Sequence, residues 1–430
     1  MVNRRKFFQI AGSTALAMSP VTRMLCKTDE RAVRQNFNLP DYYPIEESIE
    51  DEDFWYQVRM AYTVFPNLIN LNNGGVSPSP KIVQEAVERY NKLTNEAPSY
   101  YMWRILDQGR EPLREKLALL AGCDTEEIAI NRNSSEALET IIFGLRLKQG
   151  DEVVLTRQDY PNMINAWKQR EKRDGIVLKW IDLPLPMEND DQIVQKYSEQ
   201  FSTKTKIVHI THIINWTGQI IPARKIADIA HQKGIDVLVD AAHSFVHIGY
   251  KIPDLDCDYF GTSLHKWLCA PIGSGMLYVK KEKISQLYPL FAAGDPESAD
   301  IRKFENLGTR SFPIEQGISE AIDFQNMLGM ERKEKRLRYL KNYWTTKVQD
   351  LPGVKLNTSL KDNYSCAIAN FSIEGKKPEE IENTLFSKYK IHTVAINWEN
   401  IHGVRVTPNV YTLTSDLDKL VKGIREIIKS

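Results

Sequence analysis

The sequence predicts an α/β protein with a large domain on a mainly parallel sheet, followed by a smaller α/β domain. From residue 128 onward, short apolar segments alternate with segments of helical spacing. Some segments, such as 237–239, are apolar without interruption, as expected for strands that helices cover on both faces. The strands expected in the large sheet are 128–131, 152–156, 176–181, 207–211, 236–240, 259–262 and 275–279.

Helical segments separate these strands and also precede them. The expected helices are 54–64, 80–93, 134–147, 162–170, 192–199 and 223–233, with a short strand at 69–71. After residue 308 the pattern changes to a long helical stretch, 314–350, and then to a smaller alternating segment. That segment contains expected strands at 367–373, 392–396 and 403–407 and helices at 378–388 and 416–428. We therefore predict an N-terminal signal 1–27, an arm 28–71, a large domain 72–307 and a small domain 308–430.

The first residues resemble an export signal. Arg4 and Arg5 are followed by two phenylalanines and by the mildly apolar stretch 10–18. This order is typical of a twin-arginine signal, although a plain basic terminus is the alternative. We expect the protein to be exported by the twin-arginine pathway, to the periplasm or beyond.

Composition excludes several classes of protein. Lys plus Arg and Asp plus Glu both number 56, and this balance argues against a nucleic-acid partner. The five cysteines form no CxxC pair and no Cys/His cluster, so we expect no metal site. No apolar run approaches the roughly 20 residues that a membrane-spanning helix needs, so we expect no stable membrane span.

Two residues that follow expected strands carry the predicted chemistry. Asp240 ends the strand 236–240, where a buried carboxylate needs a cationic partner such as a pyridinium nitrogen. Capping a helix is an equally good explanation for this aspartate alone. Lys266 lies 26 residues later, after the next strand, in Ser263-Leu264-His265-Lys266. A lysine in an apolar, cationic pocket has a lowered pKa and forms an imine with an aldehyde. The pair therefore indicates a pyridoxal-phosphate (PLP) site, with Lys266 as the Schiff-base residue.

A seat for the phosphate is expected at the start of the helix 134–147. A helix N-terminus offers free N–H groups and the positive end of a dipole, and Ser134 and Ser135 add hydroxyl donors. Asn133 and Glu136 also fit a capping box, which is compatible with this role.

These motifs resemble the class V aminotransferase-fold PLP enzymes, a group of fold type I that includes cysteine desulfurases, kynureninase and isopenicillin N epimerase. The resemblance covers about residue 72 to the C-terminus, and isopenicillin N epimerase-like proteins are the most similar. It implies that Lys266 carries the cofactor and that Asp240 pairs with its pyridinium. The residues that it implies for the phosphate are Ser134, Ser135, Ser263 and His265. Those that it implies for the phenolic oxygen are His243 and Asn215.

The resemblance also assigns residues further along the chain. Tyr160 takes the place of the ring-stacking aromatic, although a core tyrosine is the alternative. Arg405 resembles the arginine that grips a substrate α-carboxylate, although an ordinary surface charge is the alternative. Gly308 and Thr309 look like the segment that reaches the partner subunit's phosphate, which implies a homodimer. The chain departs from the cysteine desulfurases in one respect, because 391–405 contains no cysteine.

The resulting hypothesis is a PLP enzyme that acts at the α-carbon of an amino acid, with Lys266 as the general base. Epimerisation, transamination by a class V aminotransferase and C–S or β-lyase chemistry are alternative outcomes of the same proton removal. An alternative of another class is an exported binding protein with a relic PLP fold. The intact pair of Asp240 and Lys266 counts against that alternative.

Overall fold

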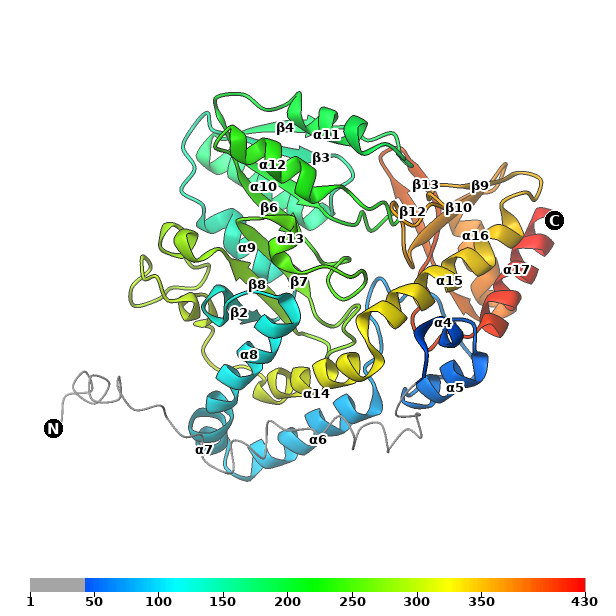
Figure 1. The fold of residues 1–430 in the computed structure, drawn as a ribbon, viewed down its shortest axis with the longest axis horizontal. Coiled ribbons are helices and arrows are strands. Elements are labelled where there is room, and N and C mark those ends of the chain that lie inside the picture. The colour runs from blue at the N-terminus through cyan, green and yellow to red at the C-terminus, as the bar shows by residue number, and fades with distance from the viewer. Residues whose placement is uncertain (1–42, 430) are drawn as a thin grey trace.

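The computed structural model describes residues 43–429 and contains a large sheet with the predicted strands (Figure 1). Its order is β2-β8-β7-β6-β5-β3-β4, and only β8 runs antiparallel to its neighbours. The strands are β2 (Ile128–Asn131), β3 (Glu152–Thr156), β4 (Val177–Ile181), β5 (Thr205–Thr211), β6 (Asp236–Asp240), β7 (Tyr259–Ser263) and β8 (Gly275–Val279). The predicted mainly parallel sheet is confirmed.

Helices cover both faces of this sheet, because each central strand is apolar on both sides. One apolar cluster joins the sheet to α9 (Ser134–Gly144) and α10 (Pro161–Asp174). The other joins it to α8 (Arg110–Ala121), α11 (Asp190–Ser198), α12 (Ala223–Gln232) and α14 (Phe312–Leu328). The carboxyl ends of β5, β6 and β7 therefore meet at one edge between two covered faces, where ligands bind in such sheets.

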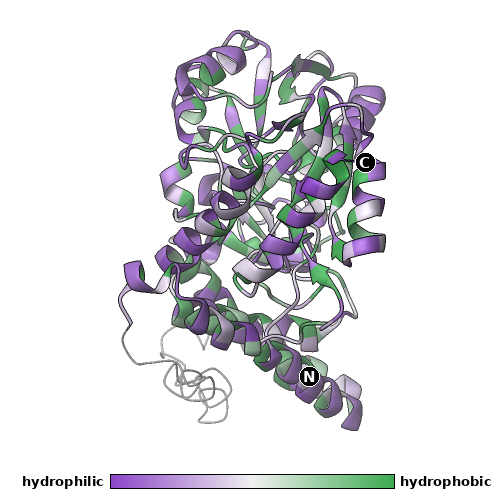
Figure 2. Cartoon of the chain, turned by 90° about the vertical axis from the view of Figure 1, so that its right-hand side faces the viewer, coloured by the Kyte–Doolittle hydropathy of each residue, from purple (hydrophilic) through white to green (hydrophobic). Residues whose placement is uncertain are grey.

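A second, four-stranded antiparallel sheet of order β12-β13-β10-β9 forms beside the first. Its strands are β9 (Val354–Leu356), β10 (Ala369–Ile373), β12 (Val394–Trp398) and β13 (Ile401–Val406). The helices α15 (Met330–Val348), α16 (Pro378–Tyr389) and α17 (Thr414–Lys429) pack on it around one apolar cluster. Figure 2 shows hydrophilic and hydrophobic residues alternating along the helices near the C-terminus, as expected for helices with one buried face. This burial of one helical face explains the amphipathic spacing in the sequence.

The chain before the large sheet connects the two domains. The helices α4 (Ile45–Ser48) and α5 (Glu52–Met60) precede β1 (Ile69–Asn70), which pairs in parallel with β11 (Ile391–His392). The helix α6 (Lys81–Glu96) then packs against α14. The remaining short elements are α7 (Pro98–Tyr100), η1 (Tyr101–Ile105), η2 (Leu106–Gly109), η3 (Thr125–Glu127), α13 (Ile252–Leu255), η4 (Lys281–Gln286) and η5 (Ile301–Glu305).

The long helical stretch expected over 314–350 is two helices. Gly329, with φ +84°, ends α14 and starts α15, and this left-handed conformation interrupts a helix. The helix α14 packs against α6 and α8, whereas α15 packs against α17. The helix α8 and the strand β9 were not expected from the sequence. The division of the chain at 27, 71 and 307 stays a prediction, and its first boundary lies outside the described residues.

Between residues 43 and 429, no helix is long and apolar enough to cross a membrane. The same residues contain no group of His, Cys, Asp and Glu arranged to hold a metal ion.

Candidate cofactor and substrate site

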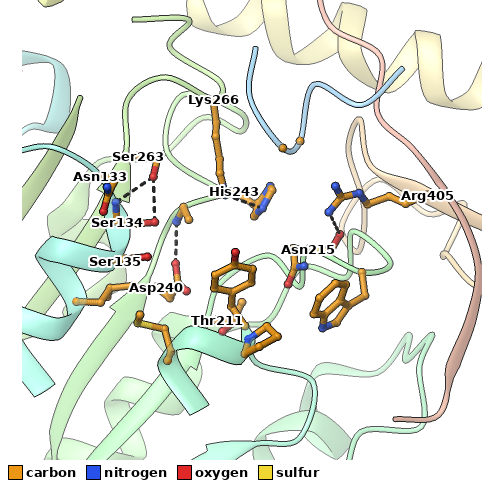
Figure 3. Close-up of a pocket in the computed structure, with 18 of the residues that line it drawn as sticks. Asn133, Ser134, Ser135, Thr211, Asn215, Asp240, His243, Ser263, Lys266 and Arg405 are labelled. Carbon is orange, nitrogen blue, oxygen red and sulfur yellow. Dashed lines mark hydrogen bonds between the residues drawn. The ribbon is translucent and has the colours of Figure 1, made fainter. Parts of the chain in front are cut away.

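A cavity of about 540 Å³ opens where β5, β6 and β7 end, and the small domain forms its opposite wall (Figure 3). The final residues of these three strands, Thr211, Asp240 and Ser263, all line it. The complete lining consists of Gly74, Gly75, Asn133, Ser134, Ser135, Leu138, Tyr160, Pro161, Met163, Thr211, Asn215, Trp216, Asp240, Ala242, His243, Ser263, His265, Lys266, Val394, Ile396 and Arg405. The structure thus brings together all the site residues predicted from the sequence except Gly308 and Thr309.

Asp240 lies at the floor of the cavity with only 4% of its surface exposed. Its Oδ1 accepts a hydrogen bond from the N–H of Ala242 at 2.9 Å, which fixes the carboxylate at the end of β6. Burial raises the pKa of this carboxyl, and the nearby His209 and Lys266 oppose that shift. A buried carboxylate with no ion-pair partner among the described residues fits the pyridinium nitrogen of PLP.

Lys266 points into the same cavity, with its Nζ 3.0 Å from Nε2 of His243. Burial lowers the pKa of Lys266 to about 8, the charge of Asp240 opposes this shift and that of Arg405 adds to it. Burial together with Lys266 and Arg405 also holds the pKa of His243 well below its usual range. His243 is therefore neutral, and its Nε2 shares a hydrogen bond with the Nζ of Lys266. A lysine of lowered pKa presents the free amine that an imine bond requires.

The residues predicted to bind the phosphate lie together at the N-terminus of α9. The hydroxyl of Ser263 accepts from the N–H of Ser134 and donates to its Oγ, both at 2.9 Å. Asn133 caps the helix, because its Oδ1 accepts from the N–H of Glu136 at 2.9 Å. The capping box is incomplete, since the Glu136 carboxylate accepts from the N–H of Arg132 instead. A Cβ at Gly275 would lie 2.6 Å from the backbone of Asn133, so only glycine allows β8 to approach this turn.

The opposite end of the cavity holds Arg405, as Figure 3 shows. Arg405 is 7% exposed; its Nη1 donates to the carbonyl of Asn215 at 3.1 Å and its Nη2 to Oδ1 of Asn72 at 3.0 Å. No carboxylate pairs with Arg405 among residues 43–429. Burial lowers its pKa to about 10. The alternative of a surface charge is therefore wrong, and the guanidinium is a buried cation that lacks an anion.

Several buried polar atoms in this cavity have no partner among the described residues. They are Oγ1 of Thr211, Oδ1 of Asn215, Nε1 of Trp216, Nδ1 of His243 and Nε of Arg405. Buried polar atoms are usually paired, so these atoms indicate a polar ligand. A phosphate at α9, a ring above Asp240 and an aldehyde at Lys266 would account for the polar residues at the end of the cavity away from Arg405, so this part of the cavity fits PLP.

Tyr160 directly precedes α10 and lines the cavity, and it is not a core residue because 41% of its surface is exposed. Its ring lies 6.5 Å from that of Trp216, which in turn stacks on Trp398 at 5.5 Å. Sequence reasoning missed Trp216, which directly follows the predicted Asn215, and it also missed Val394 and Ile396. The position of Trp216 after β5 was a usable signal, whereas nothing local distinguishes the two aliphatic residues on β12.

Gly308 and Thr309 lie outside the cavity, exposed between η5 and α14. Gly308 has φ +77°, and nothing lies within 4 Å of the position that a Cβ would take. A contact between this segment and the phosphate of a partner subunit stays a prediction.

The fold and the site define a PLP-dependent enzyme of fold type I: a mainly parallel sheet places a carboxylate, a lysine and a helix N-terminus around one cavity. The chain belongs to the aminotransferase class-V family, whose model matches residues 69–406. This membership confirms the fold class, the enzyme class and the PLP cofactor predicted from the sequence.

This chain is similar to known proteins over most of its length. The isopenicillin N epimerase of Streptomyces clavuligerus is 26% identical over 387 residues, which cover 86% of this chain and 97% of that protein. A probable cysteine desulfurase of Halalkalibacterium halodurans is 28% identical over 385 residues, which cover 84% and 93%. The apo structure of a cysteine desulfurase from Thermococcus onnurineus NA1 shares the fold, with a TM-score of 0.77, 22% identity and coverage of 86% and 97%.

Proposed function

We propose that this protein removes the α-proton of a free amino acid, in a reaction similar to that of isopenicillin N epimerase. The observation that carries the proposal is the position of Lys266 and Arg405 in one cavity, above the buried Asp240. Lys266 supplies a base, and Arg405 supplies a binding site for a carboxylate.

The residues of this chain divide the work between them. Arg405 holds the α-carboxylate of the substrate by two N–H groups, and this fixes the α-carbon within the cavity. Lys266 takes the α-proton on its Nζ, and a pKa of about 8, lowered from 10.5 by burial, makes its neutral amine far more abundant near neutral pH than that of an exposed lysine. Asp240 would hold the pyridinium nitrogen of PLP in its protonated form, and neutral His243 would lie at the phenolic oxygen. When bound, PLP supplies an electron sink for the charge that proton removal leaves at the α-carbon.

The fate of the removed proton decides the reaction. Protonation of the α-carbon from the opposite face would give epimerisation, protonation on the cofactor side would give transamination, and loss of a β-substituent would give lyase chemistry. A cysteine nucleophile has no support, because none of the cysteines in residues 43–429 lines the cavity and Cys366 is fully buried beside His247. The similarity to two isopenicillin N epimerases supports the first outcome.

Exchange of the α-hydrogen in heavy water tests this proposal. Holoenzyme is incubated with a panel of L- and D-amino acids and the α-proton signal is followed by NMR. We expect exchange with at least one amino acid and none in Lys266→Ala. Chiral analysis of the same samples detects epimerisation, added 2-oxo acids reveal transamination, and released pyruvate, ammonia or sulfide reveals a lyase. Exchange by amines without a carboxylate, and by no amino acid, would contradict the role of Arg405.

A relic binding protein is separated from an enzyme by its spectrum. We expect purified protein to be yellow, and borohydride to bleach it while fixing the cofactor on Lys266. Peptide mapping that finds the label on another lysine would refute the assignment.

We also propose that the protein is a homodimer in which Gly308 and Thr309 reach the phosphate of the partner subunit. Exposure of both residues outside their own cavity supports this. Sedimentation should give twice the 49.5 kDa chain mass. Thr309→Asp should weaken PLP binding because it adds an anion, whereas Thr346→Asp on the exposed part of α15 should not. A monomer that binds PLP fully would contradict the proposal.

Export by the twin-arginine pathway completes the proposal. The sequence of residues 1–27 supports it, and these residues lie outside the described part of the chain. Replacing Arg4 and Arg5 with lysine should leave the protein in the cytoplasm, as fractionation and immunoblotting would detect. Unchanged export of that variant would refute the signal.

A further inference from the structure

We propose that the cavity selects amino acids with an uncharged, apolar side chain, and that Trp216, Val394 and Ile396 form the subsite for that side chain. This inference rests on the proposed function and adds the substrate class to it.

The subsite is defined by the two polar ends of the cavity. Ser134, Ser135 and Ser263 lie at one end and Arg405 at the other, with Lys266 between them (Figure 3). A carboxylate on Arg405 therefore places the substrate side chain among the residues that surround the guanidinium.

On the small-domain side these neighbours are aliphatic. Val394 on β12 is the direct cross-strand partner of Arg405 on β13. Ile396 lies two residues further along the same strand, so it shares the face of Val394, and both residues line the cavity. This wall therefore presents one cation and two branched aliphatic side chains.

On the large-domain side the neighbours are an aromatic ring, two glycines and uncharged polar side chains. Trp216 lines the cavity and stacks on Trp398, with ring centroids 5.5 Å apart and an interplanar angle of 25°. Gly74 and Gly75 contribute backbone alone, and a Cβ at Gly74 would lie 3.1 Å from Thr407 and 3.5 Å from His243. The space beside Arg405 is thus bordered by the Trp216 ring and by Val394 and Ile396, and its remaining neighbours, Asn72, Asn215 and Tyr160, are polar but uncharged.

The charges of the lining exclude an ionised side chain. Among the described residues that line the cavity, Asp240 is the one carboxylate, and it lies on the floor where the cofactor ring would bind. Lys266 and Arg405 are both used, by the cofactor and by the α-carboxylate. No second cation remains for an acidic side chain, and no carboxylate remains for a basic one. An ionised group without a partner is disfavoured in such a place.

Contacts between the domains hold this wall in position. Trp398 Nε1 donates to the carbonyl of Arg157 at 2.9 Å, and Asn400 Nδ2 donates to that of Leu183 at 3.1 Å. Gln158 Nε2 also donates to Oδ1 of Asn400 at 3.1 Å. The hairpin of β12 and β13 is therefore fixed to the large domain, and the subsite is built before a substrate arrives.

Simple carboxylic acids test the subsite without α-carbon chemistry, because they lack the amino group. Calorimetry on the holoenzyme would compare propanoate, butanoate and pentanoate with glutarate and 5-aminopentanoate, which have the same chain length as pentanoate. We expect affinity to rise about fourfold for each added methylene. Both charged acids should bind at least about tenfold more weakly than pentanoate. Equal or tighter binding of either charged acid, or no binding of any acid, would overturn the subsite.

Two variants locate the subsite on β12. Val394→Arg should reverse the preference, so that glutarate binds about tenfold more tightly than pentanoate. Val177→Arg is the matched control, because Val177 is exposed on β4 outside the cavity, and it should keep the wild-type order. Ile396→Ala should weaken pentanoate severalfold more than propanoate, and it serves if the arginine variant does not fold. An unchanged order of affinities in every folded β12 variant would refute the assignment.

The proposed function and the subsite can fail separately. If α-proton exchange occurs fastest with glutamate or lysine, the proposed function stands and the apolar subsite falls. If pentanoate binds as expected and no amino acid exchanges its α-proton, the subsite stands and the proposed reaction falls.

Discussion

Replacing Arg405 with methionine should leave the fold intact while abolishing recognition of the substrate. Arg405 is a buried cation whose hydrogen bonds go to the neutral oxygens of Asn215 and Asn72. Methionine has a similar length and no charge. We expect affinity for the substrate to fall while stability changes little. The reason is that Arg405 has no anionic partner among the described residues, so its replacement breaks no ion pair within the protein.

The magnitude follows from the pKa of the guanidinium. Burial lowers it from 12.5 to about 10, which corresponds to roughly 3 kcal/mol of unfavourable charge burial. Loss of two hydrogen bonds costs about 1 kcal/mol each. The free energy of unfolding of Arg405→Met should therefore stay within about 1 kcal/mol of the wild type. Loss of the contact with a substrate carboxylate should cost about 3 kcal/mol, or roughly 150-fold in Kd.

Two measurements on the holoenzyme check this. Urea denaturation gives the change in the free energy of unfolding, and calorimetry with the preferred amino acid gives Kd. Arg405→Lys serves as the charge-retaining control and should recover part of the affinity, because an ammonium lacks the bidentate geometry. A loss of more than 3 kcal/mol in stability would show that the guanidinium is a structural anchor. Unchanged affinity would refute its role at the carboxylate.

Three further predictions concern the floor of the site and the junction of the domains. The rate at which apoprotein binds PLP should rise about tenfold per pH unit up to pH 8 and then level off, because only the neutral amine of Lys266 reacts. Absorbance measures this rate, and a rise that continues to pH 10 would contradict the lowered pKa. Asp240→Asn should retain PLP but lose α-proton exchange by on the order of 100-fold, and unchanged exchange would remove this residue from the mechanism. Gly218→Ala should destabilise by about 3 kcal/mol, since φ is +80° and a Cβ would lie 2.3 Å from the carbonyl oxygen of Ile368. Gly234→Ala, with φ +69° and open space, should cost only about 1 kcal/mol in urea denaturation, and equal losses would refute the clash.

The sequence alone determined the architecture of the large domain and the half of the site that lies on it. Strand and helix periodicities are local properties, and they predicted all seven strands of the large sheet. Parallel strands bring their carboxyl ends to one edge, so Asp240 and Lys266 could be placed together although 26 residues separate them. The predicted phosphate site at Ser134 also came from a local pattern, because the capping residues of a helix indicate where it begins.

Local patterns were insufficient where a packing partner decides the structure. The helix α8 was not expected, although Leu113, Leu117 and Ala121 recur at helical spacing. The break at Gly329 also escaped, because a single glycine within a helical pattern is often tolerated.

Only the tertiary structure determined the electrostatics of the site and the wall opposite Lys266. The pKa of Lys266 depends on burial and on Asp240 and Arg405, and Arg405 comes from a different sheet. Its contact with the carbonyl of Asn215 joins residues 190 positions apart, and Val394 enters the cavity only because β12 pairs with β13 in one register. Desolvation and pairing between distant segments are properties of the folded chain, and the spacing of residues along the sequence does not encode them.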